Sequence, residues 1–149
     1  MTEATQLCTF LVDDLYFGVD VRDVQEVIRF QRLTPVPLAA HHLRGLINLR
    51  GRVVPAIDMR RRLQLPERGP DQLPMNIVLR TDDGPVSLLV DEIVDVVEVD
   101  PDMYEPRPEV VCGPVWHFIH SIYKLPERLL LVLDTERAVS VNWAERESA

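Results

Sequence analysis

The chain has 149 residues, of which 46% are hydrophobic and 27% charged, so its length and composition are those of one ordinary globular domain. Its formal net charge of −8 disfavours attraction to nucleic acid or anionic lipid, because the long-range field repels phosphate. Two separated cysteines, Cys8 and Cys112, argue against a disulfide scaffold or a zinc ribbon, and we expect both to be core or strand thiols in a reducing compartment.

The first predicted elements are a hairpin and a short helix. Alternating apolar residues over 8–12 and 15–21, separated by the turn residues Asp13 and Asp14, predict two strands. The period then changes, because Val24, Val27 and Ile28 recur at helical spacing. We expect a helix here, with the three apolar residues on one face and Glu26 on another.

A second hairpin and a second short helix follow. Two apolar runs, 46–49 and 53–57, are joined by Arg50, Gly51 and Arg52, where Gly51 supplies the positive φ that a tight turn requires. Asp58 is placed to cap a helix whose buried side would carry Met59 and Leu63. We expect the arginines at 60–62 to lie mostly in water.

The remaining sequence predicts more short strands. Residues 66–74 contain three prolines and a glycine and indicate a connector. Asp134 is placed to cap a short terminal helix. Short strands at regular spacing with few helices are typical of small β-barrels. We therefore predict a first barrel over 8–65, a second over 75–133, and a terminal helix and tail over 134–149, with strands at 77–79, 86–90, 93–99, 116–123 and 129–133.

Sites for metal or catalysis are weakly supported. His41 and His42 have no nearby cysteine or acidic partner, and His117 and His120 would point to opposite faces of a strand. Ser121 beside His120 would point away from it, so the two make no useful dyad. No metal or cofactor is expected. The acidic Asp91-Glu92 region keeps one alternative open, a small ligand-binding domain or enzyme with a carboxylate as its acid or base.

An ordered set of motifs resembles the CheW-like chemotaxis coupling proteins. The set covers about residues 8 to 139, and its order and spacing are more specific than any one piece. Its members are Val24-Gln25-Glu26-Val27-Ile28, Pro35-Val36-Pro37, Leu43-Arg44-Gly45-Leu46-Ile47-Asn48-Leu49-Arg50-Gly51, Val54-Pro55-Ala56-Ile57-Asp58, Leu89-Val90-Asp91-Glu92-Ile93, Ile122-Tyr123-Lys124-Leu125 and Leu131-Val132-Leu133-Asp134.

The resemblance implies a mainly β fold of two packed, SH3-like, five-stranded barrels, and a role as an adaptor rather than an enzyme. Such an adaptor couples the helical hairpin tip of a chemoreceptor to the regulatory domain of a CheA-type histidine kinase. The partners implied are these two proteins, with no nucleic acid and no insertion into a membrane. The pathway served, whether swimming, surface motility, development or a second messenger, stays open.

The resemblance also implies the receptor-binding residues, which are Val24, Glu26, Val27, Asn48, Arg50 and Gly51. Arg50, at a hairpin tip, could bond a partner's carboxylates or carbonyls bidentately. Asn48 would fix the turn through bonds to the backbone, and the two valines could equally be core residues. Ile47, Leu49 and Val90 could line an apolar groove between the barrels or fill a barrel interior. The kinase contacts, expected mainly on the second barrel, are assigned to no residue.

Two positions depart from the family pattern. Ser87 stands where relatives usually have glycine before the Leu-Val-Asp run, and Ser121-Ile122-Tyr123-Lys124 stands where they usually have a Gly-Ile-Ala-Lys-like segment. We place both in the second barrel, where larger side chains would reshape the groove or the kinase-facing surface. Charge is also uneven: residues 1–74 carry 10 Lys+Arg and 9 Asp+Glu, hence +1, and residues 75–149 carry 6 and 15, hence −9. This asymmetry predicts two faces for different partners. With no secretory leader and no apolar run of ~18 residues, we expect a cytosolic protein.

Overall fold

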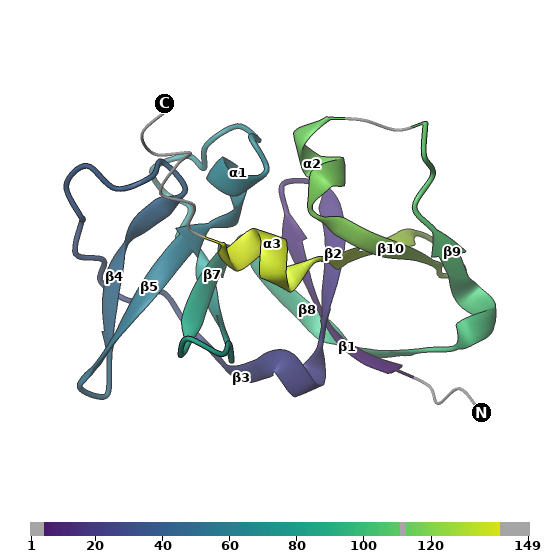
Figure 1. Ribbon diagram of the computed structural model, residues 1–149, viewed down its shortest axis with the longest axis horizontal. Coiled ribbons are helices and arrows are strands. Elements are labelled where there is room, and N and C mark those ends of the chain that lie inside the picture. Colours follow the sequence, from purple (N-terminus) through teal and green to yellow (C-terminus); the bar gives the residue numbers. More distant parts are fainter. Residues whose placement is uncertain (1–4, 111–112, 141–149) are drawn as a thin grey trace.

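The computed structural model describes residues 5–110 and 113–140 and is mainly β, with two packed barrels and a few short helices (Figure 1). The strands are β1 Thr5–Val12, β2 Leu15–Asp20, β3 Val24–Ile28, β4 Leu43–Leu49, β5 Arg52–Asp58, β6 Met75–Leu79, β7 Val86–Val90, β8 Glu92–Val99, β9 Tyr104–Pro106, β10 Ile119–Lys124 and β11 Leu129–Leu133. The helices are α1 Met59–Arg62, α2 Pro114–His117 and α3 Thr135–Val139, with single 3₁₀ turns at Val21–Asp23 and Pro101–Met103.

The two sheets repeat one strand pattern. The five-stranded sheet, here the first barrel, has the order β3-β6-β7-β5-β4, and the six-stranded sheet, the second barrel, has the order β8-β1-β2-β11-β10-β9. Each contains an antiparallel hairpin whose second strand also pairs in parallel with a strand from outside the hairpin: β7 lies beside the earlier strand β5 in one sheet, and β2 lies beside the later strand β11 in the other. The second barrel thus has one strand more than predicted, the three-residue β9.

The predicted division of the chain between the barrels is corrected by this topology. Strands β1 and β2 lie in the predicted first barrel but pair with β8 and β11 in the second. Strands β6 and β7 follow the connector and yet belong to the first barrel. The boundary prediction over 8–65 and 75–133 fails because strand pairing joins distant segments, with Phe17 of β2 beside Leu131 of β11, and local patterns do not reveal such pairing.

A close backbone contact closes the first barrel. Thr34, in the segment after β3, lies beside Leu46 of β4. The Thr34 N–H donates to the Leu46 carbonyl and the Leu46 N–H donates to the Thr34 carbonyl, both at 2.8 Å. A Cβ on Gly45 would lie only 2.6 Å from the Thr34 carbonyl oxygen. Gly45 is therefore required for the two edges to meet.

The hydrophobic core has three parts. The largest cluster joins the barrels, with Phe10 and Phe17 from the second and Ile57 and Leu88 from the first. Smaller clusters fill each barrel interior. Ile47 and Val90 are buried in these cores and Leu49 packs against one of them, so they are interior residues. The space between the sheets is thus largely filled by side chains.

Residues 21–28 do not form the predicted helix. A single 3₁₀ turn is followed by β3, which pairs with β6. Val24, Glu26 and Ile28 are half-buried, while Gln25 and Val27 are exposed, which is strand alternation. A register shift between Val24 and Glu26 marks an irregularity in the ladder. Val24 packs against the core that the two barrels share, which is one of the two roles the sequence left open for the valines. Val27 is 40% exposed and is not part of that core.

Both predicted helix caps are confirmed. The Asp58 carboxylate accepts from the backbone N–H of Arg60, and the Asp134 carboxylate from that of Arg137. Met59 and Leu63 are buried as expected. The arginines of α1 are not mostly in water, because residues 60 and 62 are only 8% and 9% exposed.

Other local expectations have mixed outcomes. Cys8 is a free, buried strand thiol whose pKa is raised by burial, and Cys112 lies outside the described residues. The predicted strand over 116–123 begins only at Ile119, because α2 occupies the preceding turn. Across residues 5–110 and 113–140, the structure contains no helix of the length and apolarity needed to cross a bilayer.

Candidate functional site

The β4–β5 hairpin presents Arg50 on a rigid two-residue turn. Leu49 pairs with Arg52, and the two residues between them have φ values of +54° for Arg50 and +84° for Gly51. Positive φ at both positions is the mark of a type I′ turn, which matches the twist of the flanking strands. The Asn48 side-chain oxygen accepts from the Gly51 backbone N–H at 2.9 Å. The turn-fixing role predicted for Asn48 is therefore confirmed.

Arg50 and Glu26 form an ion pair across the two edges of the first barrel. Both terminal nitrogens of the guanidinium donate to the carboxylate, at distances from 2.5 to 3.3 Å. The Arg50 side chain is 66% exposed and that of Glu26 is 23% exposed. From the sequence, Glu26 and Arg50 are separate groups open to partners, whereas the structure pairs them with each other.

This arrangement brings together most of the predicted site. Glu26, Asn48, Arg50 and Gly51 form one corner of the first barrel, which we name the Glu26–Arg50 corner. Val24 and Val27 lie on the same strand as Glu26, but only Val27 faces outward.

One surface residue was missed. Val53 is 65% exposed and lies opposite Asn48 in the β4–β5 register. The apolar run 53–57 predicts a strand but gives Val53 no role. Its alternation with the buried Val54 is the signal that could have indicated that Val53 faces solvent.

Val53 is one of the residues that line a hollow of about 770 Å³. This hollow lies between the first barrel and α3, and its walls include Arg52, Arg80, Asp82 and Glu136. The Arg80 guanidinium donates to the carbonyl oxygens of Arg22 and Val24 at 3.2 and 2.7 Å. The walls of this hollow are thus charged as well as apolar, whereas the groove expected from the sequence was apolar.

Asp91 is held in a buried network of ion pairs rather than poised as an acid or base. It accepts from Arg60 at 2.6 Å, from Arg68 at 2.9 Å and from the Asp13 backbone N–H at 2.6 Å. Burial acts to raise the pKa of Asp91, but the hydrogen bonds from Arg60 and Asp13 and the nearby guanidinium charges hold it below its ordinary value. Asp91 is therefore an ionised structural anchor, which removes the main support for an acid-base role of the Asp91-Glu92 region.

The two family departures lie inside the barrels. Ser87 is fully buried in β7, which belongs to the first barrel and not the second, and its hydroxyl donates to the Asn76 side-chain oxygen at 2.7 Å. Ser121 is 3% exposed in β10. Neither side chain lies on a surface where it could reshape a groove directly.

The histidines are arranged differently from the prediction. His117 ends α2 rather than lying on a strand with His120. The His120 Nδ1 atom lies 3.2 Å from the Ser121 hydroxyl, so the two do not point apart as expected. Burial of Ser121 nevertheless keeps that hydroxyl away from a substrate. Within the part of the chain that the structure describes, no group of three or more His, Cys, Asp or Glu side chains is placed to hold a metal ion.

Comparisons with known proteins agree over nearly the whole chain. The profile of the CheW-like domain family matches residues 6–142. The chemotaxis protein CheW of Bacillus subtilis is 34% identical over 129 residues, covering 87% of this chain and 83% of that protein. CheW of Treponema pallidum is 28% identical over 142 residues, covering 93% and 84%. The crystal structure of the scaffolding protein TtCheW from Thermoanaerobacter tengcongensis superposes with a TM-score of 0.80 at 26% identity, covering 88% and 89%.

Proposed function

The chain belongs to the CheW-like domain family, and from that premise we propose that it is an adaptor of chemotaxis-type signal transduction, coupling a chemoreceptor to a CheA-type histidine kinase. An adaptor needs two separate binding surfaces and no reaction chemistry. Two barrels joined by a continuous core provide a rigid body on which such surfaces keep a fixed spacing. The proposed partners place this work in the cytoplasm, where the receptor's hairpin tip lies.

We assign receptor binding to the Glu26–Arg50 corner. The observation that carries this assignment is the exposed Arg50 guanidinium, held at a hairpin tip by Glu26 and by the type I′ turn. Pairing with a carboxylate uses two of the five N–H donors of an arginine, so others stay available to carbonyls or carboxylates of a partner helix. Because Glu26 restricts the side chain in advance, less rotamer entropy is lost on binding.

The other predicted residues divide into contacts and supports. Val27 and Val53 offer exposed apolar surface on the two strands that meet at this corner. Asn48 and Gly51 hold the turn, and Val24 anchors β3 to the core. A patch that combines an arginine with small apolar side chains suits one face of a helical hairpin.

We propose that the kinase regulatory domain binds the second barrel. Its edge strand β8 exposes Val94 and Val96, at 45% and 54%, and Leu129 on β11 is also exposed. Residues 92–133, which run from β8 to β11 of this barrel, carry eight Asp and Glu against three Lys and Arg. A second surface on the other barrel would leave the Glu26–Arg50 corner free while the kinase is bound.

The test is calorimetric titration of the chain with a receptor hairpin fragment and, separately, with the kinase regulatory domain from the same organism. The proposal predicts binding to both, and binding of the second partner to a complex already saturated with the first. Competition between the partners would contradict two separate surfaces. A well-folded chain that binds neither would contradict the adaptor function.

A further inference from the structure

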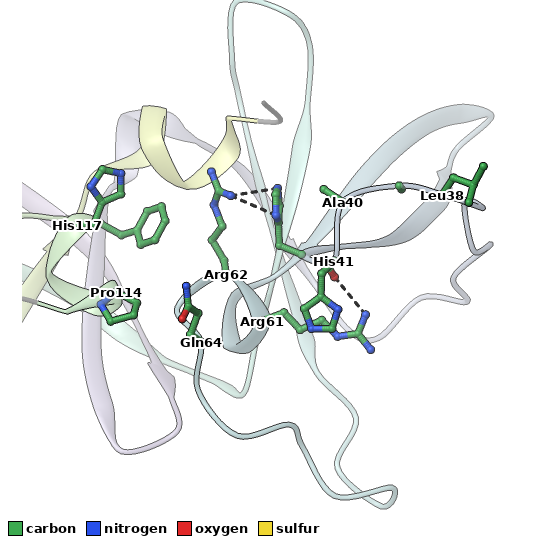
Figure 2. Close-up of a pocket in the computed structure, with 11 residues that line it drawn as sticks. Leu38, Ala40, His41, Arg61, Arg62, Gln64, Pro114 and His117 are labelled. Atoms are coloured by element: carbon green, nitrogen blue, oxygen red, sulfur yellow. Dashed lines mark hydrogen bonds between the residues drawn. The ribbon is translucent and has the colours of Figure 1, made fainter. Parts of the chain in front are cut away.

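A hollow between the barrels lies at the end of the first barrel away from the Glu26–Arg50 corner. Its volume is about 820 Å³. Figure 2 shows Pro114 and His117 from α2 on one side and Leu38 from the β3–β4 loop on the other, with Arg61 of α1 between them. Arg44 begins the outward face of β4 and Arg50 follows its end, so these two arginines are about 20 Å apart along the strand.

A second hollow of about 540 Å³ adjoins the first and shares Arg61 with it. Arg32 and Arg44, both exposed, belong to its lining. Together the hollows form a surface that we name the Arg61 surface, defined by Arg32, Leu38, His41, Arg44, Arg61 and His117.

The charge of the Arg61 surface is opposite to that of the chain. The chain has 24 Asp and Glu residues against 16 Lys and Arg, yet none of the described residues that line either hollow is acidic. Arg32, Arg44 and Arg61 provide positive charge, and His41 and His117 add imidazole rings to the lining. A positively charged hollow attracts an anionic partner to this site, although the net charge of the protein is negative and repels anions elsewhere.

Leu38 adds an exposed apolar side chain to the Arg61 surface. Its side chain is 87% exposed at the tip of the β3–β4 loop, and its backbone has a positive φ of +63°. Left-handed backbone is unfavourable for a leucine and is retained when the surrounding structure requires it. Here it projects an apolar side chain beside the positive hollow.

The protein's own Glu67 demonstrates how a carboxylate is held here. Its carboxylate accepts from the Arg61 guanidinium at 2.6 Å, although its side chain is 58% exposed. That hydrogen bond lowers the pKa of Glu67, and the charges of Arg44 and His41 lower it further. An incoming carboxylate would meet the same groups and would compete with Glu67 for Arg61.

We propose that the Arg61 surface binds an extended, acidic protein segment carrying at least one apolar side chain. Two adjoining hollows favour an extended chain over a single small anion. Concave walls disfavour a flat anionic membrane, which would touch only the rim. This surface is separate from the proposed receptor and kinase surfaces, and its occupancy does not depend on the proposed function.

The probe is a fluorescein-labelled peptide, Glu-Glu-Leu-Glu-Glu-Leu-Glu-Glu, with a second peptide in which glutamine replaces each glutamate. Fluorescence anisotropy at about 0.1 M salt measures binding, because screening suppresses weaker long-range attraction. We expect Arg44→Glu to weaken binding of the acidic peptide about tenfold. Glu67→Gln should strengthen binding severalfold, because it removes the competing carboxylate.

Lys124→Glu is the matched control. Lys124 is an exposed strand residue of the second barrel in an ion pair with Glu105, and its reversal changes the net charge as Arg44→Glu does. Equal weakening by both reversals, or equal binding of the glutamine peptide, would overturn the proposal, as would no binding of the acidic peptide. Binding of phosphatidylglycerol vesicles without binding of the peptide would also overturn it, in favour of a membrane. Circular dichroism confirms that each variant is folded.

Discussion

The Arg60 guanidinium and the Asp91 carboxylate form a bidentate pair, with Arg60 Nη2 2.6 Å from Asp91 Oδ2 and both side chains largely buried. Arg60 lies on α1 of the first barrel, whereas Asp91 lies between β7 and β8, where the chain passes from one barrel to the other. The same carboxylate accepts from the backbone N–H of Asp13 in the second barrel. Asp91 therefore fixes the two barrels at their crossing point.

Asp91→Asn should destabilise the protein by about 1–3 kcal/mol, because it removes the carboxylate charge that pairs with the largely buried Arg60 and that shares Arg68 with Asp58. Urea unfolding followed by circular dichroism measures the change. Asp82→Asn in the exposed β6–β7 turn is the control and should change stability by less than about 0.5 kcal/mol. Equal stability of the two variants would show that the network contributes nothing.

Stability should depend on acid through the same residue. The pKa of Asp91 is lower in the folded protein than in the unfolded chain, so the unfolded state binds the proton first. Its stabilising contribution is complete above the ordinary aspartate pKa of about 3.9 and is lost as pH falls through the lower folded value. Urea midpoints measured from neutral pH down into this range should fall less steeply for Asp91→Asn than for the parent. Parallel curves would contradict this role.

Gly45→Ala should destabilise the first barrel by about 1–3 kcal/mol, because the new Cβ would lie 2.6 Å from the Thr34 carbonyl oxygen and force the closing contact apart. Gly69→Ala is the control, since the nearest atom to a Cβ there is 3.9 Å away. Thermal unfolding compares the variants. Hydrogen exchange at the Thr34 and Leu46 amides should become faster in Gly45→Ala alone. Unchanged exchange would contradict this account of barrel closure.

Exchanging the charges of the corner separates its structural role from its binding role. Arg50→Glu alone places two carboxylates together, and adding Glu26→Arg restores an ion pair in reversed order. We expect the double variant to regain the stability lost by the single one, within the 0.2–1 kcal/mol or so typical of exposed pairs. Receptor-fragment affinity, measured by calorimetry, should stay low in both, because the hairpin tip no longer presents a guanidinium. Recovery of affinity in the double variant would show that any ion pair suffices.

Local signals predicted the parts of the fold that local contacts determine. The β4–β5 hairpin, the positive φ of Gly51 and the caps Asp58 and Asp134 all depend on neighbours within a few residues. Residues 24–28 were assigned to a helix because their apolar spacing fits that period, whereas pairing with β6, about 50 residues later, makes them a strand. Tertiary pairing decided between two periods that a five-residue segment cannot distinguish.

Long-range partners also explain the errors at the site. Nothing near Arg60 indicates burial, since its partner Asp91 is 31 residues away. Glu26 and Arg50 are 24 residues apart and meet only because β3 and the β4–β5 hairpin lie at the two edges that close the first barrel. The resemblance selected both residues, and only the structure shows that they form one unit.

The most direct test of the central claim is calorimetry of Arg50→Asn beside the parent, with the receptor hairpin fragment and with the kinase regulatory domain. Asparagine before glycine is favoured in a type I′ turn, so this change removes the guanidinium while retaining the hairpin. We predict a loss of receptor affinity of about 10- to 100-fold, equivalent to roughly 1.4–2.7 kcal/mol, with unchanged kinase affinity and a melting temperature at least as high as the parent's. Receptor affinity equal to the parent's would contradict the assignment of receptor binding to the Glu26–Arg50 corner.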